Sequence, residues 1–500
     1  MIERKKVVVI GAGVGGLTAA IDLARQGADV TVVERAAEAG GKMRHVNVGG
    51  HGIDGGPTVF TMRWIFEKLF ADAGEDLTES LQLEPMTILA RHAWRQGGRL
   101  DLFADIEQSA DAIGAFSGAD DARGYRAFCA RSADIYATLK GNFIAAQKPS
   151  SPLDLTMRVG LSNLGSLWRT APMKTMWSAI GEHFRDPRLR QLFGRYATYV
   201  GSSPLLAPAT LMLIAHVEQD GVWMVNGGMR QVARALQNLA ERNGARFRFG
   251  ENVKEILTSN GHVTGVLLAS GDRLDATVVV FNGDVSALSA GLLGHDLRRA
   301  TSASRTQDRS LSAITWCMTA KPGGFPLAHH TVFFAGDYPN EFDAIFRRRE
   351  IVQRPTVYIC AQDRGFGFHG MAPSPERLLL LINAPPDGDT RRFAKAEIED
   401  LTRRAIQLLG DCGLELDYGT DNCVITAPDG FNALFPATGG ALYGRASHGP
   451  MATFARAGAM SKIKGLYLAG GSTHPGAGVP MAAMSGRLAA AKVIEGFGHT

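Results

Sequence analysis

The chain has 500 residues, 45% of them hydrophobic and 20% charged, with a formal net charge of +4 at pH 7. This length predicts two or three ordered domains, and the small basic excess does not indicate a nucleic-acid partner. Its five cysteines form no C-x-x-C pair and its histidines no metal-like spacing, so neither a disulfide framework nor a metal site is expected.

The first predicted elements are a strand, a turn, a helix and a second strand. Residues 5–10 form a short β-branched run typical of a buried parallel strand, and residues 17–26 have helical spacing. The second strand covers residues 29–34. The basic start and apolar run resemble a secretion signal only superficially, because glycines interrupt the run at once.

A G-x-G-x-x-G pattern joins the first strand to the helix, and it comprises Gly11, Gly13 and Gly16, with Gly15 inside it. Gly11 permits a tight turn, Gly13 lets a diphosphate approach the backbone, and Gly16 lets the helix pack on the strand. The helix N-terminus offers free N–H groups to phosphates. Glu34 ends the second strand, where an acid accepts hydrogen bonds from a ribose diol. The pattern predicts a dinucleotide site, with an empty glycine turn as the alternative, and it does not separate FAD from NAD.

Later elements alternate between helical and strand-like patterns. Helical patterns predominate at residues 65–146, with a strand-like interruption at 87–102, and again at 173–217. The Ser-, Gly- and Pro-rich residues 149–172 are expected to form a mobile connection. Further strands are expected at residues 223–225, 246–249, 253–258, 263–268, 275–281 and 465–469, and further helices at 229–242, 395–410 and 480–496.

This order predicts an α/β protein whose Rossmann-like nucleotide-binding domain is discontinuous. Residues 1–75, 225–300 and 420–500 are expected to form the FAD-binding domain. Residues 76–224 and 301–419 are expected to form an inserted α+β and helical region that binds substrate and associates with a membrane.

The segments that follow Glu34 resemble the FAD-dependent amine oxidase and carotenoid desaturase superfamily, whose fold is also that of GDP-dissociation inhibitors (GDI). Gly40-Gly41-Lys42-Met43-Arg44 is similar to a Gly-Gly-Arg motif of that superfamily. Lys42 stands where arginine is usual and lacks its planar fork, so Arg44 is expected to supply the bidentate contact. The stretch 54–58, with Gly56, Pro57 and Thr58, resembles the loop beside the flavin.

Two more segments carry this resemblance. Val253 falls where the superfamily contacts adenine through the backbone, although it is equally interpreted as a core strand residue. Gly470 and Gly471 resemble the glycines that bring backbone to the flavin. The helix beginning at Pro480 and Met481 would direct its N–H groups toward the negative charge of the reduced flavin.

Residues 471–480, which contain Thr473-His474-Pro475-Gly476-Ala477-Gly478, resemble bacterial-type acyclic carotenoid desaturases. The block Tyr196–Gly201 is more similar to hydroxyneurosporene (1-hydroxycarotenoid 3,4-) desaturases than to phytoene desaturases. The resemblance implies FAD-dependent removal of two hydrogens from a C–C bond of an acyclic carotenoid. Oxygen or a quinone is the expected electron acceptor, because no second dinucleotide motif is present. The alternatives are a phytoene desaturase, an amine or porphyrinogen oxidase, and a flavin-free GDI-like protein that binds prenyl groups or lipid.

Two candidate catalytic residues and one membrane segment complete the expectations. His474 is either a proton-handling residue near the flavin or a hydrogen-bonded loop histidine, and Arg169 is either a substrate-region residue or a solvated arginine. Residues 148–177 interleave basic side chains with Trp, Leu and Met, which suits an interfacial segment or, alternatively, a helix packed on the core. We expect a cytoplasmic protein peripherally associated with the inner or photosynthetic membrane, because no apolar stretch is long enough to span a bilayer.

Overall fold

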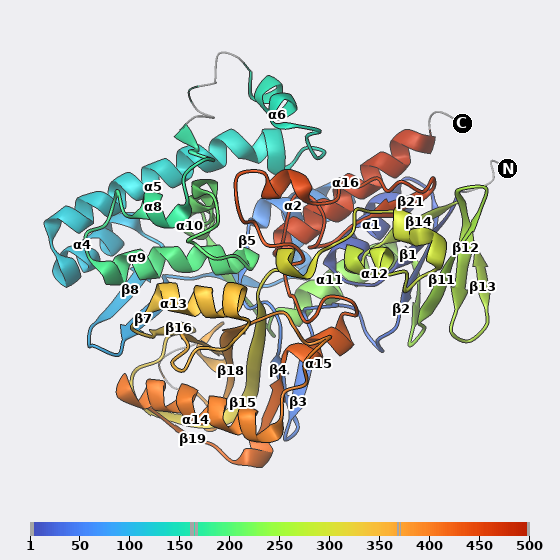
Figure 1. The fold of residues 1–500 in the computed structure, drawn as a ribbon. Helices are drawn as coiled ribbons and strands as arrows, with labels where there is room; N and C mark the ends of the chain where they lie inside the picture. Colours follow the sequence, from blue (N-terminus) through green and yellow to red (C-terminus); the bar gives the residue numbers. More distant parts are fainter. Residues whose placement is uncertain (1–4, 161–164, 166–168, 368–369, 371, 498–500) are drawn as a thin grey trace.

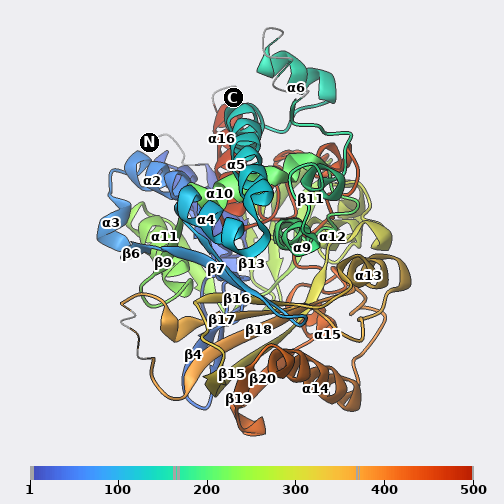
Figure 2. The ribbon, with the colours of Figure 1, turned by 90° about the vertical axis from the view of Figure 1, so that its left-hand side faces the viewer.

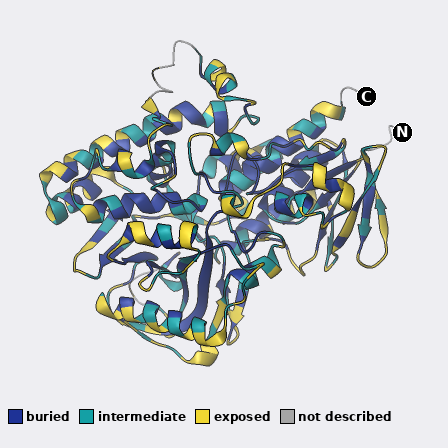
Figure 3. Ribbon diagram, in the orientation of Figure 1, coloured by how far each residue is buried: buried dark blue, intermediate teal, exposed yellow. Residues whose placement is uncertain are grey.

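The computed structural model of the chain describes residues 5–160, 165, 169–367, 370 and 372–497. Two main sheets and a group of helices make up the molecule (Figure 1). Figure 3 shows that the strands of both sheets are mainly buried, whereas exposed residues gather on the outer helices and loops.

A five-stranded parallel sheet takes its strands from three distant parts of the chain. Its order is β10 (Arg246–Phe249), β2 (Asp29–Glu34), β1 (Lys6–Ile10), β14 (Val278–Phe281) and β21 (Leu466–Leu468). Alternating side chains of β1 enter two cores: Val7 and Val9 pack on one face of the sheet and Val8 on the other. β-Branched residues suit a strand buried on both faces. The expected α/β class is confirmed.

Different layers cover the two faces of this sheet. On one face α1 (Val14–Arg25) packs against both α11 (Arg230–Arg242) and α16 (Val479–Phe497). The core on the other face is shared with a smaller antiparallel sheet and a short helix: β11 (Val253–Ser259), β12 (His262–Leu268), β13 (Arg273–Asp275) and α12 (Val285–Ser289). The single strand expected at residues 275–281 is wrong, because β13 ends at Asp275 to pair with β12 and β14 begins at Val278 in the parallel sheet.

The second sheet is mixed and lies in the lower part of the molecule in Figure 1. Its strands follow the order β19 (Leu414–Asp417), β15 (Ser312–Gly324), β18 (Glu376–Ala384), β17 (Val357–Ala361), β16 (His330–Phe334), β7 (Ile88–Trp94) and β8 (Arg99–Phe103). α14 (Lys395–Asp411) shares a core with one face of this sheet. β20 (Cys423–Thr426) pairs with β15. This strand falls within the range 420–500 that was expected for the FAD-binding domain, and its pairing places it in the mixed sheet.

The remaining elements lie around these sheets. The hairpin of β3 (His45–Val48) and β4 (His51–Asp54) packs on β15, and a small sheet joins β5 (Phe60–Thr61), β9 (Val222–Val225) and β6 (Leu83–Pro85). The other helices are α2 (Arg63–Asp72), α3 (Leu77–Ser80), α4 (Ile106–Ser117), α5 (Ala119–Leu139), α6 (Pro152–Val159), α8 (Met176–Ile180), α9 (Pro187–Gly194), α10 (Leu213–Gln219), α13 (Tyr338–Asp343) and α15 (Pro428–Leu434). Short 3₁₀ or π turns lie at Lys140–Ile144, Arg195–Val200, Ala209–Met212, His295–Arg299, Thr306–Asp308, Ala344–Arg348, Gln362–Arg364, Thr420–Asn422 and Ala452–Ala455.

Helix α6 lies within residues 149–172, where the sequence predicted an irregular, mobile connection; residues 161–164 and 166–168 of this range lie outside the described residues. The Ser151 side chain accepts a hydrogen bond from the backbone N–H of Asp154, and Pro152 occupies the first turn. Serine as N-cap followed by proline starts a helix, although the same residues are typical of loops. Within the described ranges, no helix is both long and apolar enough to cross a bilayer.

Candidate functional site

The glycine turn lies at the carboxyl end of β1, where α1 begins. Gly11 has a φ of +96°, which favours glycine, and Gly13 is the N-cap residue of α1. Among the described residues no side chain caps this helix end. Its first N–H groups are therefore open to an acceptor such as a diphosphate.

Two glycines of this motif face neighbouring backbone. A Cβ on Gly16 would lie 2.1 Å from the Gly11 carbonyl oxygen, and one on Gly15 would lie 2.8 Å from the Gly470 amide nitrogen. Asn282, at the end of β14, donates a hydrogen bond from Nδ2 to the Gly11 oxygen over 3.1 Å. The turn is thus contacted by two neighbouring segments, at Gly470 and at Asn282, and Asn282 is a positioning residue that no sequence motif had indicated.

The carboxylate of Glu34 is fixed beside this turn. Its Oε2 accepts from the Ala12 N–H at 2.7 Å, and its Oε1 accepts from the Ala36 N–H at 2.9 Å. The Glu251 N–H donates to the Glu34 backbone oxygen, which brings the segment before Val253 to the same edge. Val253 itself is buried at the start of β11. Each Glu34 oxygen keeps capacity to accept a ribose hydroxyl.

The two cationic side chains of the motif at residues 40–44 contact different segments of the chain. Gly41 lies against Gly13, and Lys42 donates from Nζ to the Leu442 oxygen at 2.5 Å. Burial lowers the pKa of Lys42, and the nearby Asp284 opposes that change. Arg44 donates from Nη2 to Thr426 Oγ1 at 2.9 Å, on the mixed sheet.

A second buried cation accompanies Lys42 and was missed by the sequence analysis. Arg456 donates to the backbone oxygens of Gly471, Tyr443 and Arg445, and burial lowers its pKa to about 10. The negative charge of Asp284 opposes the lowering of the pKa of both Arg456 and Lys42. Two buried cations near one carboxylate suit an anionic ligand. No known spacing surrounds Arg456, so only its three-dimensional position reveals it.

The remaining glycine loops meet at a large cavity. A Cβ on Gly56 would lie 1.8 Å from the Lys42 oxygen, so this loop packs closely on the second motif. The Gly471 oxygen accepts a hydrogen bond from Arg456, and the Gly470 N–H donates one to Ser485 Oγ. The residues predicted beside the flavin that line the cavity are Gly56, Pro57, Thr58, Pro480 and Met481.

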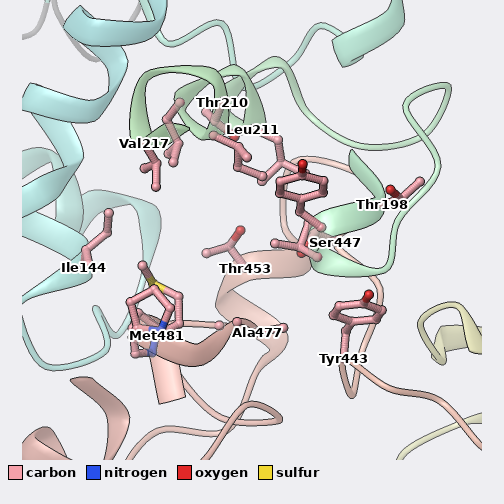
Figure 4. A pocket seen from close by; sticks show the side chains of 18 of the residues that line it. Ile144, Thr198, Thr210, Leu211, Val217, Tyr443, Ser447, Thr453, Ala477 and Met481 are labelled. Atoms are coloured by element: carbon pink, nitrogen blue, oxygen red, sulfur yellow. The ribbon is translucent and has the colours of Figure 1, made fainter. Parts of the chain in front are cut away.

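The cavity has a volume of about 530 Å³ and is mostly apolar. Figure 4 shows Ile144, Val217 and Leu211 on one side of an open space and Thr198 and Tyr443 on the other. Its lining also includes residues from the α6 region: Pro152, Leu155, Thr156, Pro172 and Met173. The cavity therefore connects the glycine loops with the peripheral helix α6, and its shape and polarity suit a long apolar molecule.

One part of the cavity wall carries a buried polar network. Tyr199 donates from its hydroxyl to Glu218 Oε1 at 2.5 Å, and Tyr196 donates to Glu218 Oε2 at 2.7 Å. Arg195 donates from Nη1 to the Tyr199 hydroxyl at 2.9 Å. A tyrosine hydroxyl therefore links the two opposite charges.

A second polar chain lies in the cavity wall and includes Thr58 of the loop that was expected beside the flavin. Thr58 Oγ1 lies 2.7 Å from the Tyr358 hydroxyl, which lies 2.8 Å from His330 Nδ1. His329, His330 and Cys360 bring their ligand atoms within 4.8 Å of one another, a grouping absent from the sequence patterns. Burial lowers the pKa of His329 to about 4 and that of His330 well below its usual value, and it raises the pKa of Cys360. All three side chains are therefore neutral at pH 7.

The two candidate catalytic residues lie outside the described cavity lining. His474 Nε2 lies 2.9 Å from the Ala146 oxygen, and the ring packs edge-on against Phe143. Burial lowers the pKa of His474 to about 4, so its ring is neutral at pH 7. This hydrogen bond and burial fit the interpretation of His474 as a hydrogen-bonded loop histidine. Arg169 is exposed and forms an ion pair with Asp134 at 2.9 Å.

The structure describes most of the predicted membrane segment at residues 148–177. Met176 is buried, and Trp177 packs on Gly194 and Tyr338, so both side chains serve the core. Trp168 lies outside the described residues. The exposed apolar side chains of this region are instead those of Leu153, Met157 and Met173, with exposed fractions of 67%, 63% and 75%.

Comparison with known proteins is consistent with this geometry. The family described as flavin containing amine oxidoreductase matches residues 14–494. Hydroxyneurosporene desaturase of Rubrivivax gelatinosus is 52% identical over 100% of this chain and 95% of its own length. The 1-hydroxycarotenoid 3,4-desaturase of a Flavobacterium species is 31% identical over 97% of this chain and 98% of its own. A solved oxidoreductase from Methanosarcina mazei shares the fold, with a TM-score of 0.59 at 16% identity, and the match covers 98% of this chain and all of that one.

Proposed function

Because this chain belongs to the family of flavin-containing amine oxidoreductases, we propose that it is an FAD-dependent carotenoid desaturase that acts on the 3,4 bond of an acyclic 1-hydroxycarotenoid. The observation that carries this function is the 52% identity, over the whole chain, with a hydroxyneurosporene desaturase. The relative named for 1-hydroxycarotenoid 3,4-desaturation supports the position of the bond.

The cavity supports the substrate class. Its lining is mostly apolar and extends from the glycine loops to the peripheral helix α6. Transfer of an apolar polyene from water into an apolar cavity is favourable, and apolar side chains in the wall do not compete for polar contacts. The same lining excludes water from the reacting bond.

The residues around the glycine turn fit FAD. The uncapped start of α1 and the buried cations Lys42 and Arg456 favour the diphosphate, and Glu34 is held in place to bind a ribose. The loops at Gly56 and Gly470 would hold the ring system next to the cavity. When bound, FAD supplies the oxidising power that removes two hydrogens from the substrate. For the electrons, oxygen or a quinone is the proposed acceptor, because the sequence has no second dinucleotide motif.

The proposal extends to domains and location. Strands of the parallel sheet lie in residues 1–75, 225–300 and 420–500, which supports a discontinuous Rossmann-like FAD domain, with β20 assigned to the substrate region. The exposed Leu153, Met157 and Met173 beside the cavity support a peripheral contact with the inner or photosynthetic membrane. A substrate dissolved in lipid could then enter the cavity directly.

Purified protein tests the function in two steps. The protein should be yellow from bound flavin, which a flavin-free GDI-like protein would not be. It should then convert a 1-hydroxylated neurosporene or lycopene in preference to phytoene, with quinone or oxygen as acceptor. Preferential conversion of phytoene would identify a phytoene desaturase, and conversion of neither by flavin-loaded protein would contradict the carotenoid substrate.

A further inference from the structure

The Arg195–Tyr199–Glu218 network is unusual within an otherwise apolar cavity. Arg195 has 7% of its surface exposed and Glu218 has 4%, yet both line the cavity together with Tyr199. Burying such charges carries a large desolvation cost, and the hydrogen bonds described above offset only part of it.

The network retains unused hydrogen-bonding capacity. Within the described part of the chain, Arg195 Nε and Nη2 are buried without a hydrogen-bond partner. The Tyr199 side chain is partly accessible although protein surrounds it, because it faces the cavity. Its oxygen accepts from Arg195 and its O–H donates to Glu218, which leaves one lone pair for another donor. A buried group with spare capacity favours a polar ligand over an apolar one.

The network lines the same cavity as the loop at residues 56–58, which is proposed to hold the flavin. Arg195, Tyr199, Tyr358 and Thr58 all belong to this lining. Tyr358 in turn contacts Thr58 of the loop that lines the cavity. A substrate group held at Arg195 and Tyr199 would thus lie in the same cavity as the loop proposed to hold the flavin.

The chemistry of the substrate requires such proximity. In a 1-hydroxycarotenoid that is desaturated between carbons 3 and 4, the hydroxyl carbon lies only two bonds from the reacting bond. The hydroxyl must then be recognised inside the cavity, next to the loops that hold the flavin, rather than at its outer end.

Resting on the proposed function, we infer that Arg195, Tyr199 and Glu218 form the subsite that binds the substrate's 1-hydroxyl group. The hydroxyl hydrogen is donated to Tyr199 or Glu218, and its oxygen accepts from Arg195. This network is the specificity determinant of the cavity, because a carotenoid without the hydroxyl leaves these buried groups unpaired.

The test compares a 1-hydroxylated carotenoid with the same polyene lacking the hydroxyl. Flavin-loaded wild type should favour the hydroxylated substrate in kcat/KM by more than about 100-fold, the limit for an apolar pocket. Tyr199→Phe and Glu218→Gln should each lower this ratio at least about 10-fold, by weakening use of the hydroxylated substrate. Binding of both polyenes, followed by quenching of tryptophan fluorescence, should show the same loss without turnover.

Tyr125→Phe is the matched control, because it removes another buried tyrosine hydroxyl, one that accepts from Gln219, next to Glu218 in sequence. Its ratio should remain that of wild type, since Tyr125 does not belong to the described cavity lining. An unchanged ratio in both network variants, or an equal loss in Tyr125→Phe, would overturn the inference. If flavin-loaded wild type converts neither polyene, the proposed function fails, and the binding measurement still decides whether the network recognises a hydroxyl.

Discussion

Glu34 illustrates how a single side chain prepares the cofactor site. Two backbone N–H groups fix its carboxylate at the edge of the glycine turn before any ligand arrives. Glu34→Ala should weaken FAD binding by about 1–3 kcal/mol, because the ribose loses its acceptor and two N–H groups lose theirs. Titration of apoprotein with FAD measures this loss. Glu38→Ala, which removes an exposed acid paired with Arg230, should leave FAD affinity unchanged.

Substitution of Gly13 tests whether the diphosphate of the cofactor approaches the backbone at this position. A side chain here would project beside Asn282 Nδ2, which lies 2.9 Å from the position of a Cβ. Gly13→Val should therefore reduce flavin content more than Glu34→Ala, since it fills the space required by the ligand. Gly141→Ala serves as control, because no described atom outside its neighbouring residues and its own helical turn lies within 4 Å of the added methyl group. Purification of Gly13→Val with full flavin would contradict the dinucleotide assignment.

His474 gives the fold a defined pH dependence. Burial lowers the pKa of His474 to about 4, whereas an unfolded histidine titrates near 6.5. Between these values the unfolded chain binds a proton that the folded chain does not, so the free energy of unfolding falls as pH decreases below 6.5. From pH 7.5 to pH 5, wild type should lose about 2 kcal/mol more stability than His474→Gln. Denaturant unfolding at both values measures this difference, and parallel losses would contradict the buried neutral histidine.

At the scale of elements, local patterns predicted most of what lies close in sequence. The β1–turn–α1 unit follows from adjacent residues, because the valines, glycines and helical spacing all lie within 25 residues. Helix α6 was missed because Ser151 and Pro152 are typical of both loops and helix starts, and only the cap hydrogen bond decides. The pairing of Tyr199 with Glu218 joins a 3₁₀ turn to α10, and sequence spacing carries no signal for such a contact.

Helix α6 carries the proposed membrane contact. Figure 2 shows α6 and β20 at opposite ends of the molecule. Replacing Leu153, Met157 and Met173 with Ser should reduce sedimentation with anionic liposomes severalfold, because exposed apolar area drives interfacial binding. The pair Val424→Ser and Ile425→Ser, on β20, removes exposed apolar side chains elsewhere and should not reduce sedimentation.

Flavin content provides the check on α6. It should match wild type in both sets of variants, because neither set touches the glycine loops. Equal liposome binding by wild type and the α6 variants would contradict a role of this helix at the membrane.

At the scale of the whole molecule, the C-terminal helix closes the fold. A Cβ on Gly486 would lie 2.0 Å from the Gly15 oxygen, and Thr18 donates to the Ala483 oxygen at 2.9 Å. α16 therefore lies directly on α1, although Thr18 and Ala483 are 465 positions apart in the sequence. The sequence predicted both helices and a shared domain, but it could not predict this contact, because small residues on a helix do not identify their partner.

Arg487 contributes ion pairs to the contact of α16 with the rest of the fold. It forms ion pairs with Asp22 of α1 and Asp72 of α2, and its side chain is 13% exposed, with 6% for Asp22 and 25% for Asp72. Arg487→Leu keeps most of the apolar stem but leaves two partly buried carboxylates without this partner. The free energy of unfolding should fall by about 3 kcal/mol, as in other broken buried pairs.

Lys492→Leu is the matched control in the same helix, since Lys492 pairs with the well-exposed Glu495. Its loss should remain below about 1 kcal/mol, because water screens an exposed pair and holding two long side chains together costs entropy. Denaturant titration of the flavin-loaded proteins compares the two variants under one condition. Raising the salt concentration should reduce the small Lys492→Leu effect further but leave most of the Arg487→Leu effect, because buried charges are screened less. Equal losses in both variants would mean that the ion pairs of Arg487 do not help to hold α16 against α1 and α2.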